Sequence, residues 1–434
     1  MKVVMIGAGY VGLVSGACFA EFGTDVVVMD VAADKIAALK EGRIPIYEPG
    51  LDTLVATNVA DGRLRFTDNL EDAVHGANAV FLAVGTPARR GDGHADLSFV
   101  FAAAEQVARA ATGPLVLVTK STVPVGTGRK VQEIVKRVRP ELQIDVASNP
   151  EFLREGSAIN DFMRPDRVVI GADSDRAEQM LQRLYRPLYL IETPVVRTSI
   201  ETAELIKYAA NAFLAMKITF INQMADICEK AGADVQDVAR GMGLDGRIGR
   251  KFLHAGAGYG GSCFPKDTLA LARSAQELGV PATIVEATIA ANDARKVAMA
   301  KRIIDACGGS VKGKTVAVLG LTFKPETDDM RDAPSLVMVP MLLEAGAKIR
   351  AFDPQPAIAR QLLPKDVHYA ASALDAADGA DALALLTEWN EFRALSPEKL
   401  KSAMRGKVVC DLRNVWHPAT MRECGFTYSS IGRP

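Results

Sequence analysis

The sequence predicts an α/β protein with two Rossmann-like, doubly wound parallel-sheet domains joined by a long central helix. Three observations support this. Short apolar runs alternate with helix-like segments over the first 200 residues, Glu201–Ala231 contains neither Pro nor Gly, and the alternation returns after Lys314. Strands that alternate with helices are typical of a parallel sheet covered on both faces. We therefore expect three parts: residues 1–200, 201–306 and 307–434.

The first part is expected to begin as strand, turn, helix and strand. Lys2–Ile6 and Asp25–Met29 are short Val-rich runs, the turn is glycine-rich at Gly7–Gly12, and Leu13–Phe22 has the composition of a helix that stops at a glycine. The later strands of this part are predicted at Ala79–Val84, Leu115–Thr119, Ile144–Ala147 and Val168–Ile170, with helices at Leu97–Ala111 and Arg129–Val138.

The middle part is expected to be helical, because apolar residues recur at helical spacing in Glu201–Ala231 and again in Ala282–Ala306. The last part repeats the opening order of elements more weakly, since it lacks the full glycine triplet. Its elements are predicted at Lys314–Leu319 (strand), Ser335–Ala345 (helix), Lys348–Phe352, Ala380–Leu386 and Lys407–Cys410 (strands).

Composition excludes several classes of protein. The 434 residues are 49% apolar and 24% charged, as in an ordinary globular chain, and the net charge of −1 argues against a nucleic-acid-binding protein. The six cysteines form no CxxC pair and no metal-ligand pattern with the five histidines, so a reducing cytoplasm is the expected compartment. The uncharged run Val3–Ala20 follows Lys2, as in a signal peptide or membrane span, but its four glycines argue against both.

The sequence GAGYVG at Gly7–Gly12 matches the dinucleotide-binding pattern GxGxxG. It follows a predicted strand, opens a predicted helix and precedes an acidic residue, Asp30, by 18 positions. The helix N-terminus would bind a pyrophosphate, and Asp30 would accept hydrogen bonds from the ribose hydroxyls and repel a 2′-phosphate. This favours NAD over NADP. The alternatives are a turn that merely needs glycines and, for Lys35, either a cation that tolerates a phosphate or a solvated helix lysine.

Two pairs of polar residues are spaced for one helix face. Asn149-Pro150 suits a helix start, which would place Glu151 and Glu155 on one face, although simple capping explains the pattern equally well. Lys207 and Asn211 have the same spacing among small neighbours and could stabilise an oxyanion; the alternative is a snorkelling lysine.

Cys263 is the cysteine whose surroundings indicate chemistry. Four glycines precede Ser262-Cys263, and Pro265 then starts a predicted helix, with Lys266 and Asp267 in its first turn. A helix N-terminus and a nearby cation favour a nucleophilic thiolate. A buried structural role fits Cys18, Cys228 and Cys307 better, because they lie in helical patterns.

Lys324 and Arg331 follow the strand that ends at Gly320, where ligands of parallel sheets bind; a surface charge run is the alternative.

Taken together, these segments resemble the UDP-glucose/GDP-mannose dehydrogenase family of nucleotide-sugar dehydrogenases. The motifs that carry the resemblance are GAGYVG, KSTVPVGT, NPEFLREG, the Lys207/Asn211 helix, GRIGRKF, GYGGSCFPKD and GLTFKPETDDMRDAPS. FPKD is similar to the UDP-glucose branch, and enzymes for GDP-mannose or UDP-N-acetylmannosamine are the close alternatives. The resemblance implies NAD-dependent four-electron oxidation of UDP-glucose to UDP-glucuronate, a step toward polysaccharide synthesis, by a homodimer. It assigns NAD binding to residues 1–200, dimerisation and catalysis to 201–306, and UDP-sugar binding to 307–434.

The resemblance also implies residue roles. Cys263 would form a thiohemiacetal and then a thioester, Lys207 and Asn211 would stabilise oxyanions, Asp267 and Thr122 would handle protons, and Glu151 would assist thioester hydrolysis. The NAD side would comprise Gly7, Gly9, Tyr10, Val11, Gly12, Asp30, Lys35, Thr86, Thr122, Glu155, Lys266 and Arg331. The substrate side would comprise Glu151, Phe152, Leu153, Arg154, Lys207, Asn211, Phe252, Leu253, His254, Ala255, Gly256, Gly260, Lys324, Arg413 and, reaching the partner subunit's substrate, Arg247.

Two other classes share part of the pattern. A two-electron dehydrogenase of small hydroxy acids has the same layout but needs no reactive cysteine. A non-catalytic NAD sensor would account for GAGYVG and Asp30 but not for Cys263 together with Lys207 and Asp267.

Overall fold

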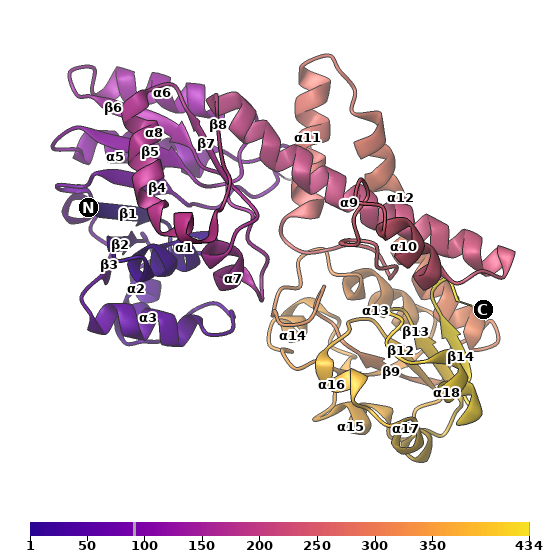
Figure 1. Ribbon diagram of the computed structural model, residues 1–434. Coiled ribbons are helices and arrows are strands. Elements are labelled where there is room, and N and C mark those ends of the chain that lie inside the picture. The colour runs from indigo at the N-terminus through magenta and orange to yellow at the C-terminus, as the bar shows by residue number, and fades with distance from the viewer. Residues whose placement is uncertain (90–92, 434) are drawn as a thin grey trace. The chain divides into compact units, whose positions relative to one another are not determined.

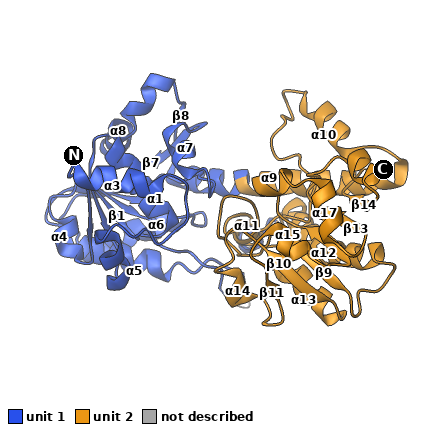
Figure 2. Cartoon of the chain, turned by 90° about the horizontal axis from the view of Figure 1, so that it is seen from below, with its two compact units in different colours: residues 1–210, 273–280 blue, residues 211–272, 281–434 orange. Residues whose placement is uncertain are grey.

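The computed structural model describes residues 1–89 and 93–433. The chain divides into two compact units, residues 1–210 with 273–280 and residues 211–272 with 281–434 (Figure 2). Each unit contains one α/β sheet, and the boundary at residues 210/211 falls inside the long helix α9 (Ile200–Ala231). The predicted fold class of two Rossmann-like sheets joined by a long central helix is confirmed, whereas the three-part division stays a prediction.

The first unit holds an eight-stranded sheet in the order β3-β2-β1-β4-β5-β6-β7-β8 (Figure 1). The order reverses between β1 and β4, as it does in dinucleotide-binding folds. β7 runs antiparallel to β6, so the prediction of an all-parallel sheet is wrong at that one pair. The strands are β1 Lys2–Ile6, β2 Asp25–Met29, β3 Leu64–Thr67, β4 Ala79–Leu82, β5 Leu115–Thr119, β6 Ile144–Ser148, β7 Val168–Ala172 and β8 Val195–Thr198.

Helices cover this sheet on both faces, and two separate clusters of apolar side chains fill the space between. The central strands are buried on both faces, which explains why they appear in the sequence as continuous apolar runs. The helices are α1 Tyr10–Glu21, α2 Ala33–Lys40, α3 Leu51–Ala60, α4 Leu70–Val74, α5 Ser98–Ala110, α6 Thr127–Val138, α7 Ala158–Met163, α8 Asp175–Leu184 and the 3₁₀ helix η1 Arg186–Ile191.

The second unit holds a six-stranded, wholly parallel sheet in the order β11-β10-β9-β12-β13-β14. Its strands are β9 Thr315–Leu319, β10 Lys348–Phe352, β11 His368–Tyr369, β12 Ala382–Leu385, β13 Val408–Asp411 and β14 Thr427–Ser430. The remaining helices are α10 Val235–Gly243, α11 Phe264–Glu277, α12 Thr283–Ala306, α13 Ser335–Glu344, α14 Ala359–Leu362, α15 Ala373–Ala377, α16 Asn390–Arg393, α17 Pro397–Ala403 and α18 Pro418–Glu423.

The helix predicted to start at Asn149-Pro150 does not form. α7 begins only at Ala158, so Glu151 and Glu155 do not share a helix face. The physical reason is that the polar side chains bind elsewhere: Glu151 Oε2 accepts from the Leu153 amide at 2.6 Å, and Asn149 Nδ2 donates to the carbonyl of Val169 at 2.8 Å. Such local side-chain bonds compete with helix formation.

None of the helices in residues 1–89 and 93–433 is both long and apolar enough to cross a membrane. The uncharged run at the start of the chain is instead β1, the glycine turn and most of α1.

Candidate active site

The glycine turn of the first unit leaves room at the N-terminus of α1. Gly7 has φ +106°, a conformation that L side chains rarely adopt, and a Cβ on Gly12 would lie 1.9 Å from the carbonyl oxygen of Gly7. Apart from Gly9 and its chain neighbours, no atom of the described residues lies within 4 Å of the position that a Cβ on Gly9 would take. The residues present therefore fit a pyrophosphate at the free N–H groups of the helix.

Asp30 follows the last residue of β2, beside this turn. Its Oδ2 accepts from the Ala8 amide at 2.8 Å and from Lys35 Nζ at 3.0 Å, and its Oδ1 accepts from the Ala32 amide at 3.0 Å. Partial burial acts to raise the pKa of Asp30, but the two amide bonds and Lys35 hold it below its ordinary value. The carboxylate is therefore charged, as a ribose acceptor must be, and Lys35 is its ion-pair partner.

Glu48, which sequence analysis missed, links this turn to the segment that follows Glu155. Its carboxylate accepts from the Tyr10 hydroxyl, from the Gly156 amide at 2.6 Å and from the Ala158 amide at 2.7 Å. Burial and this carboxylate raise the pKa of Tyr10. Glu48 is separated from its partners by dozens of residues, so no local motif reports the contact.

Thr86 and Thr122, both assigned to the NAD side, are brought together in the first unit. The Thr86 hydroxyl donates to the Thr122 carbonyl at 2.9 Å, which fixes the loops after β4 and β5 against each other. These strands are neighbours in the sheet, so their carboxyl ends lie at one edge.

Glu151 and Lys207 form a buried ion pair in the first unit. Lys207 Nζ lies 3.0 Å from Glu151 Oε1, and the two side chains are 3% and 5% exposed. Burial acts to raise the pKa of Glu151, but the Lys207 charge and the Leu153 amide bond hold it below its ordinary value. Lys207 Nζ also lies 5.3 Å from the centroid of the Phe152 ring. The snorkelling alternative for Lys207 is excluded, because the ammonium is buried and not at the surface.

A second buried lysine, Lys120, lies in the same unit. Its Nζ donates to Asn149 Oδ1 at 3.0 Å and to the Tyr185 hydroxyl at 3.1 Å, and burial lowers its pKa to about 7. Lys120 opens the KSTVPVGT segment. Lys120 follows β5, so the side chain of Asn149, two residues before Glu151, is held by a residue at the end of the neighbouring strand. Arg154, another predicted substrate-side residue of the NPEFLREG segment, forms an ion pair with Asp161 at 2.5 Å.

Cys263 lies at the N-terminus of α11 in the second unit, as predicted. The Cys263 carbonyl accepts from the Asp267 amide at 2.8 Å, so Cys263 is the residue that opens the helix. Its side chain is half-buried and its Sγ lies 3.4 Å from the Ser262 hydroxyl. Cys18, Cys228 and Cys307 are buried among apolar side chains, as predicted for structural cysteines.

Asp267 is a buried carboxylate in the first turn of α11. Its Oδ2 accepts from Asn211 Nδ2 at 2.6 Å and its Oδ1 from Lys266 Nζ at 2.6 Å, and its side chain is 1% exposed. Asn211 comes from α9, so this contact joins two helices of the second unit. The start of α11 thus supplies a thiol, a carboxylate and an ammonium group, and α9 supplies the amide of Asn211.

The loop before Cys263 is shaped by close approach of other groups. A Cβ on Gly256 would lie 2.5 Å from Arg413 Nη1, and a Cβ on Gly260 would lie 2.5 Å from the Asp332 carbonyl oxygen. Arg413 is itself held by two hydrogen bonds to Glu388, at 2.6 and 2.5 Å. Phe252 adopts a left-handed backbone with φ +65°, a strained conformation of the kind that clusters at functional sites.

A cavity of about 420 Å³ adjoins this loop. Basic side chains of Arg240, Arg250, His254 and Arg413 line it, together with Leu253 and Ala255, which sequence analysis had assigned to the substrate. Arg240 and Arg250 were missed. A cation-rich lining of this kind suits a phosphate-bearing ligand.

Three other predicted basic residues of the second unit, Arg331, Lys324 and Arg247, have local side-chain contacts, and the Arg331 carbonyl accepts from the Gly261 amide at 2.7 Å. Arg331 is bonded to both oxygens of Asp329, at 2.8 and 2.9 Å, and Lys324 Nζ lies 5.3 Å from the centroid of the Phe323 ring. Arg247 is 89% exposed and forms an ion pair with Asp245 at 2.5 Å.

Comparison with known proteins decides the family. Models of the UDP-glucose/GDP-mannose dehydrogenase family match residues 1–189 (NAD binding domain), 201–294 (central domain) and 317–418 (UDP binding domain). The chain belongs to this family. It is 59% identical to the UDP-glucose 6-dehydrogenase of Rhizobium meliloti (strain 1021), covering 100% of both chains, and 48% identical to the UDP-glucose 6-dehydrogenase TuaD of Bacillus subtilis (strain 168), covering 100% of this chain and 93% of that one.

A solved structure of a UDP-glucose dehydrogenase from Pyrobaculum islandicum matches with a TM-score of 0.92 and 38% identity, over 100% of this chain and 98% of that one. As a member of the UDP-glucose/GDP-mannose dehydrogenase family, the protein is an oxidoreductase with an NAD-binding domain. The resemblance drawn from the motifs and the NAD prediction are both confirmed.

Proposed function

We propose that this enzyme oxidises UDP-glucose to UDP-glucuronate in two successive two-electron steps, with Cys263 as the covalent nucleophile. NAD held at the glycine turn and Asp30 would supply the hydride acceptor, and two NAD molecules would be consumed per sugar, one in each step. The proposal is supported by the half-buried Cys263 thiol at the start of α11, whose first turn holds Asp267 between Asn211 and Lys266. This is the observation that carries it. The names of the relatives point to the same substrate.

The two oxidations and the hydrolysis use the side chains of the site one after another. The first oxidation removes a proton from the primary alcohol and a hydride from its carbon, giving an aldehyde; Asp267, with Thr122, takes the role of managing the proton. The Cys263 thiolate then adds to the aldehyde carbon and forms a thiohemiacetal, whose oxyanion drives out the second hydride. The resulting thioester is hydrolysed by water, which releases the carboxylate and restores the thiol.

Lys207, Asn211 and Glu151 take supporting roles. A cationic Lys207 and the Asn211 amide stabilise the negative oxygen of the tetrahedral intermediates. Glu151, kept ionised by the Lys207 charge, accepts a proton from the water that attacks the thioester. The cation-lined cavity beside the Phe252–Gly256 loop supports binding of the diphosphate by Arg413 and its neighbours.

The substrate is tested by counting NADH formed per sugar with UDP-glucose, UDP-N-acetylmannosamine and GDP-mannose. Two NADH per UDP-glucose, with much lower kcat/KM for the other two sugars, is the expected result. One NADH per sugar, or a preference for another nucleotide sugar, would overturn the assignment.

Cofactor choice is expected to depend on Asp30. The wild-type enzyme should use NAD far better than NADP, because the Asp30 carboxylate faces the ribose and repels a 2′-phosphate. Replacing Asp30 by Ser should lower the ratio of kcat/KM with NAD to kcat/KM with NADP by about tenfold or more. A factor of about ten corresponds to the loss of one charge–charge interaction. Equal use of NAD and NADP by the wild type would show that Asp30 does not bind the ribose. Asp25, at the other end of β2, gives a matched control (Asp25→Ser).

We propose that the enzyme is a homodimer in which Arg247 reaches the partner subunit's substrate, and the exposed side chains of α9 support the dimer. Phe213, Phe220 and Ile227 recur every seven residues on α9 and are 57%, 42% and 57% exposed. An apolar stripe of this spacing is typical of a helix that packs on another.

Sedimentation velocity at micromolar concentration should give a dimer for the wild type and a monomer for Phe220→Lys, with activity lost in the monomer. Thr202→Lys, at an exposed position in the first turn of the same helix, adds the same single positive charge and serves as the control. A fully active wild-type monomer would contradict both the dimer and the role of Arg247.

A further inference from the structure

The loop that leads to Cys263 is held by side chains of α12 and α9 that the proposed chemistry does not use. We propose that Asn292 and Arg295 of α12, together with Asn222 of α9, are positioning residues that fix this loop and so place the thiol. The loop is defined here as residues 256–261. The inference rests on the proposed function, because it takes Cys263 as the nucleophile.

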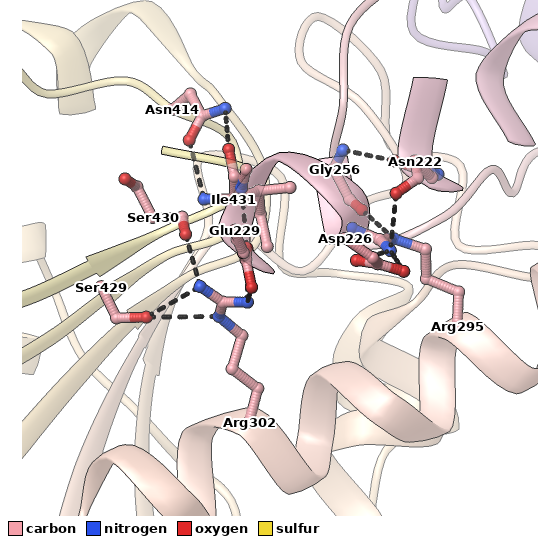
Figure 3. A network of polar contacts seen from close by, with 11 residues as sticks. Asn222, Asp226, Glu229, Gly256, Arg295, Arg302, Asn414, Ser429, Ser430 and Ile431 are labelled. Carbon is pink, nitrogen blue, oxygen red and sulfur yellow. Dashed lines mark hydrogen bonds and ion pairs between the residues drawn. The ribbon is translucent and has the colours of Figure 1, made fainter. Parts of the chain in front are cut away.

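The first point of attachment is Gly256, which is bonded on both sides of its backbone. The Gly256 amide donates to Asn222 Oδ1 at 2.8 Å, and Arg295 Nε donates to the Gly256 carbonyl at 2.7 Å (Figure 3). Asn222 and Arg295 are 2% and 7% exposed, so water does not compete for these bonds. The peptide groups on both sides of Gly256 are therefore fixed from two different helices.

The second point of attachment is Tyr259, three residues further along. Asn292 Oδ1 accepts from the Tyr259 amide at 2.8 Å, and Asn292 Nδ2 donates to the Tyr259 carbonyl at 3.1 Å. Asn292 is 3% exposed. A Cβ on Gly258 would lie 2.9 Å from Asn292 Oδ1, so the glycine at this position makes room for the amide that binds its neighbour.

The guanidinium of Arg295 is itself oriented by two residues of α9. Its Nη1 donates to both carboxylate oxygens of Asp226, at 2.8 and 2.9 Å, and to the Asn222 carbonyl at 3.2 Å. The bonds to Asp226 and Asn222 orient the guanidinium, so that its Nε is held against the Gly256 carbonyl.

The four hydrogen bonds to the backbone of Gly256 and Tyr259 matter because the loop is rich in glycine. Glycine residues have more backbone freedom than any other residue, and an unrestrained loop would spread the thiol over many positions. A misplacement of about 1 Å in a reacting group can lower a rate by about 10²-fold. Fixing residues 256 and 259 at both backbone polar groups confines the chain that ends at Cys263.

The same two helices provide a control. Arg302 lies seven residues after Arg295 on α12 and forms an ion pair with Glu229 of α9 at 2.8 Å, as Arg295 does with Asp226. Arg302 also donates to the Ser429 hydroxyl and the Ser430 carbonyl of β14, and not to the loop (Figure 3). Arg302→Lys therefore perturbs an equivalent helix-to-helix ion pair without touching the loop.

The test compares Asn292→Ala, Arg295→Lys and Arg302→Lys in the full-length enzyme. Hydrogen–deuterium exchange is measured on the peptide that covers the loop, along with the alkylation rate of Cys263 by iodoacetamide and the kinetic constants for UDP-glucose and NAD. We expect Asn292→Ala and Arg295→Lys to speed exchange in the loop at least tenfold, to change the Cys263 alkylation rate, and to lower kcat by about 10–10²-fold with KM for NAD unchanged. Arg302→Lys should leave all of these near wild type while exchange rises in β14.

The proposal is overturned if the loop exchanges at the wild-type rate in both variants, if it loosens without a fall in kcat, or if Arg302→Lys lowers kcat as much. If the wild type fails to oxidise UDP-glucose, the proposed function fails instead. The exchange and alkylation rates then still decide whether these side chains hold the loop and Cys263.

Discussion

Replacement of Cys263 by serine is expected to lower the rate of acid formation by about 10³-fold or more, as when other enzymes lose their nucleophile. The second hydride leaves from a tetrahedral carbon that carries an anionic oxygen, and the aldehyde carbon becomes tetrahedral when the Cys263 thiolate adds to it. A serine hydroxyl at this position is largely protonated and is therefore a much weaker nucleophile than a thiolate. The first oxidation needs no nucleophile. The variant should therefore still produce or use the aldehyde slowly.

The measurement is steady-state NADH formation with UDP-glucose, with product analysis for aldehyde and acid. Cys307→Ser is the control, because Cys307 is buried in the core of the same unit and should affect stability only. Near wild-type acid formation by Cys263→Ser, at two NADH per sugar, would rule out the thioester route.

Lys207→Ala is expected to lower kcat by about 10²–10³-fold, the usual effect of losing one oxyanion donor. The ammonium is buried with Glu151, so its charge is not screened by water and acts strongly on nearby negative oxygens. Removing it also leaves Glu151 buried and unpaired, which destabilises a protein by about 3–5 kcal/mol.

The pH dependence of stability separates the two effects. In the wild type, the lowered pKa of Glu151 contributes stability above the ordinary value of 4.5 that is lost as pH falls through the lowered pKa. Without Lys207, the pKa of Glu151 is higher than in the wild type, because burial acts to raise it and only the Leu153 amide bond and the Lys120 charge still lower it. The variant therefore gains less stability than the wild type as pH rises. The difference in free energy of unfolding between the two proteins should therefore grow with pH.

A double variant, Lys207→Met with Glu151→Gln, controls for the buried charge. It should recover stability relative to Lys207→Ala and flatten the pH dependence, while kcat stays low. Recovery of kcat along with stability would show that Lys207 has a structural role and not a catalytic one.

Much of the fold could be predicted because its strands are buried on both faces. β1, β2, β5 and β10 have the predicted bounds, since each is a short run rich in apolar residues that is followed directly by a glycine or a charged residue. α9 was predicted to within one residue from its lack of Pro and Gly. The reversed direction of β7 could not be predicted, because apolar runs carry no information on strand direction.

The candidate site was predictable where chemistry lies within one short segment. Cys263 and Asp267 stand in one helix start, and GAGYVG is a single turn. Glu48, Lys120 and Arg295 were missed, because each acts on a partner more than 25 residues away and no periodicity links such pairs. The failed helix at Asn149 has the same origin: its capping side chain is bound by groups from distant strands.

The central claim, a thioester on Cys263, is tested most directly by peptide mass spectrometry of Glu151→Gln quenched during turnover of UDP-glucose with NAD. Because Glu151 is assigned to thioester hydrolysis, the acyl-enzyme should accumulate. The expected result is a UDP-glucuronosyl acyl group on the Cys263 peptide, with two NADH formed per enzyme in the first turnover. Two NADH per enzyme with Cys263 unmodified, or with the acyl group on another residue, would contradict it.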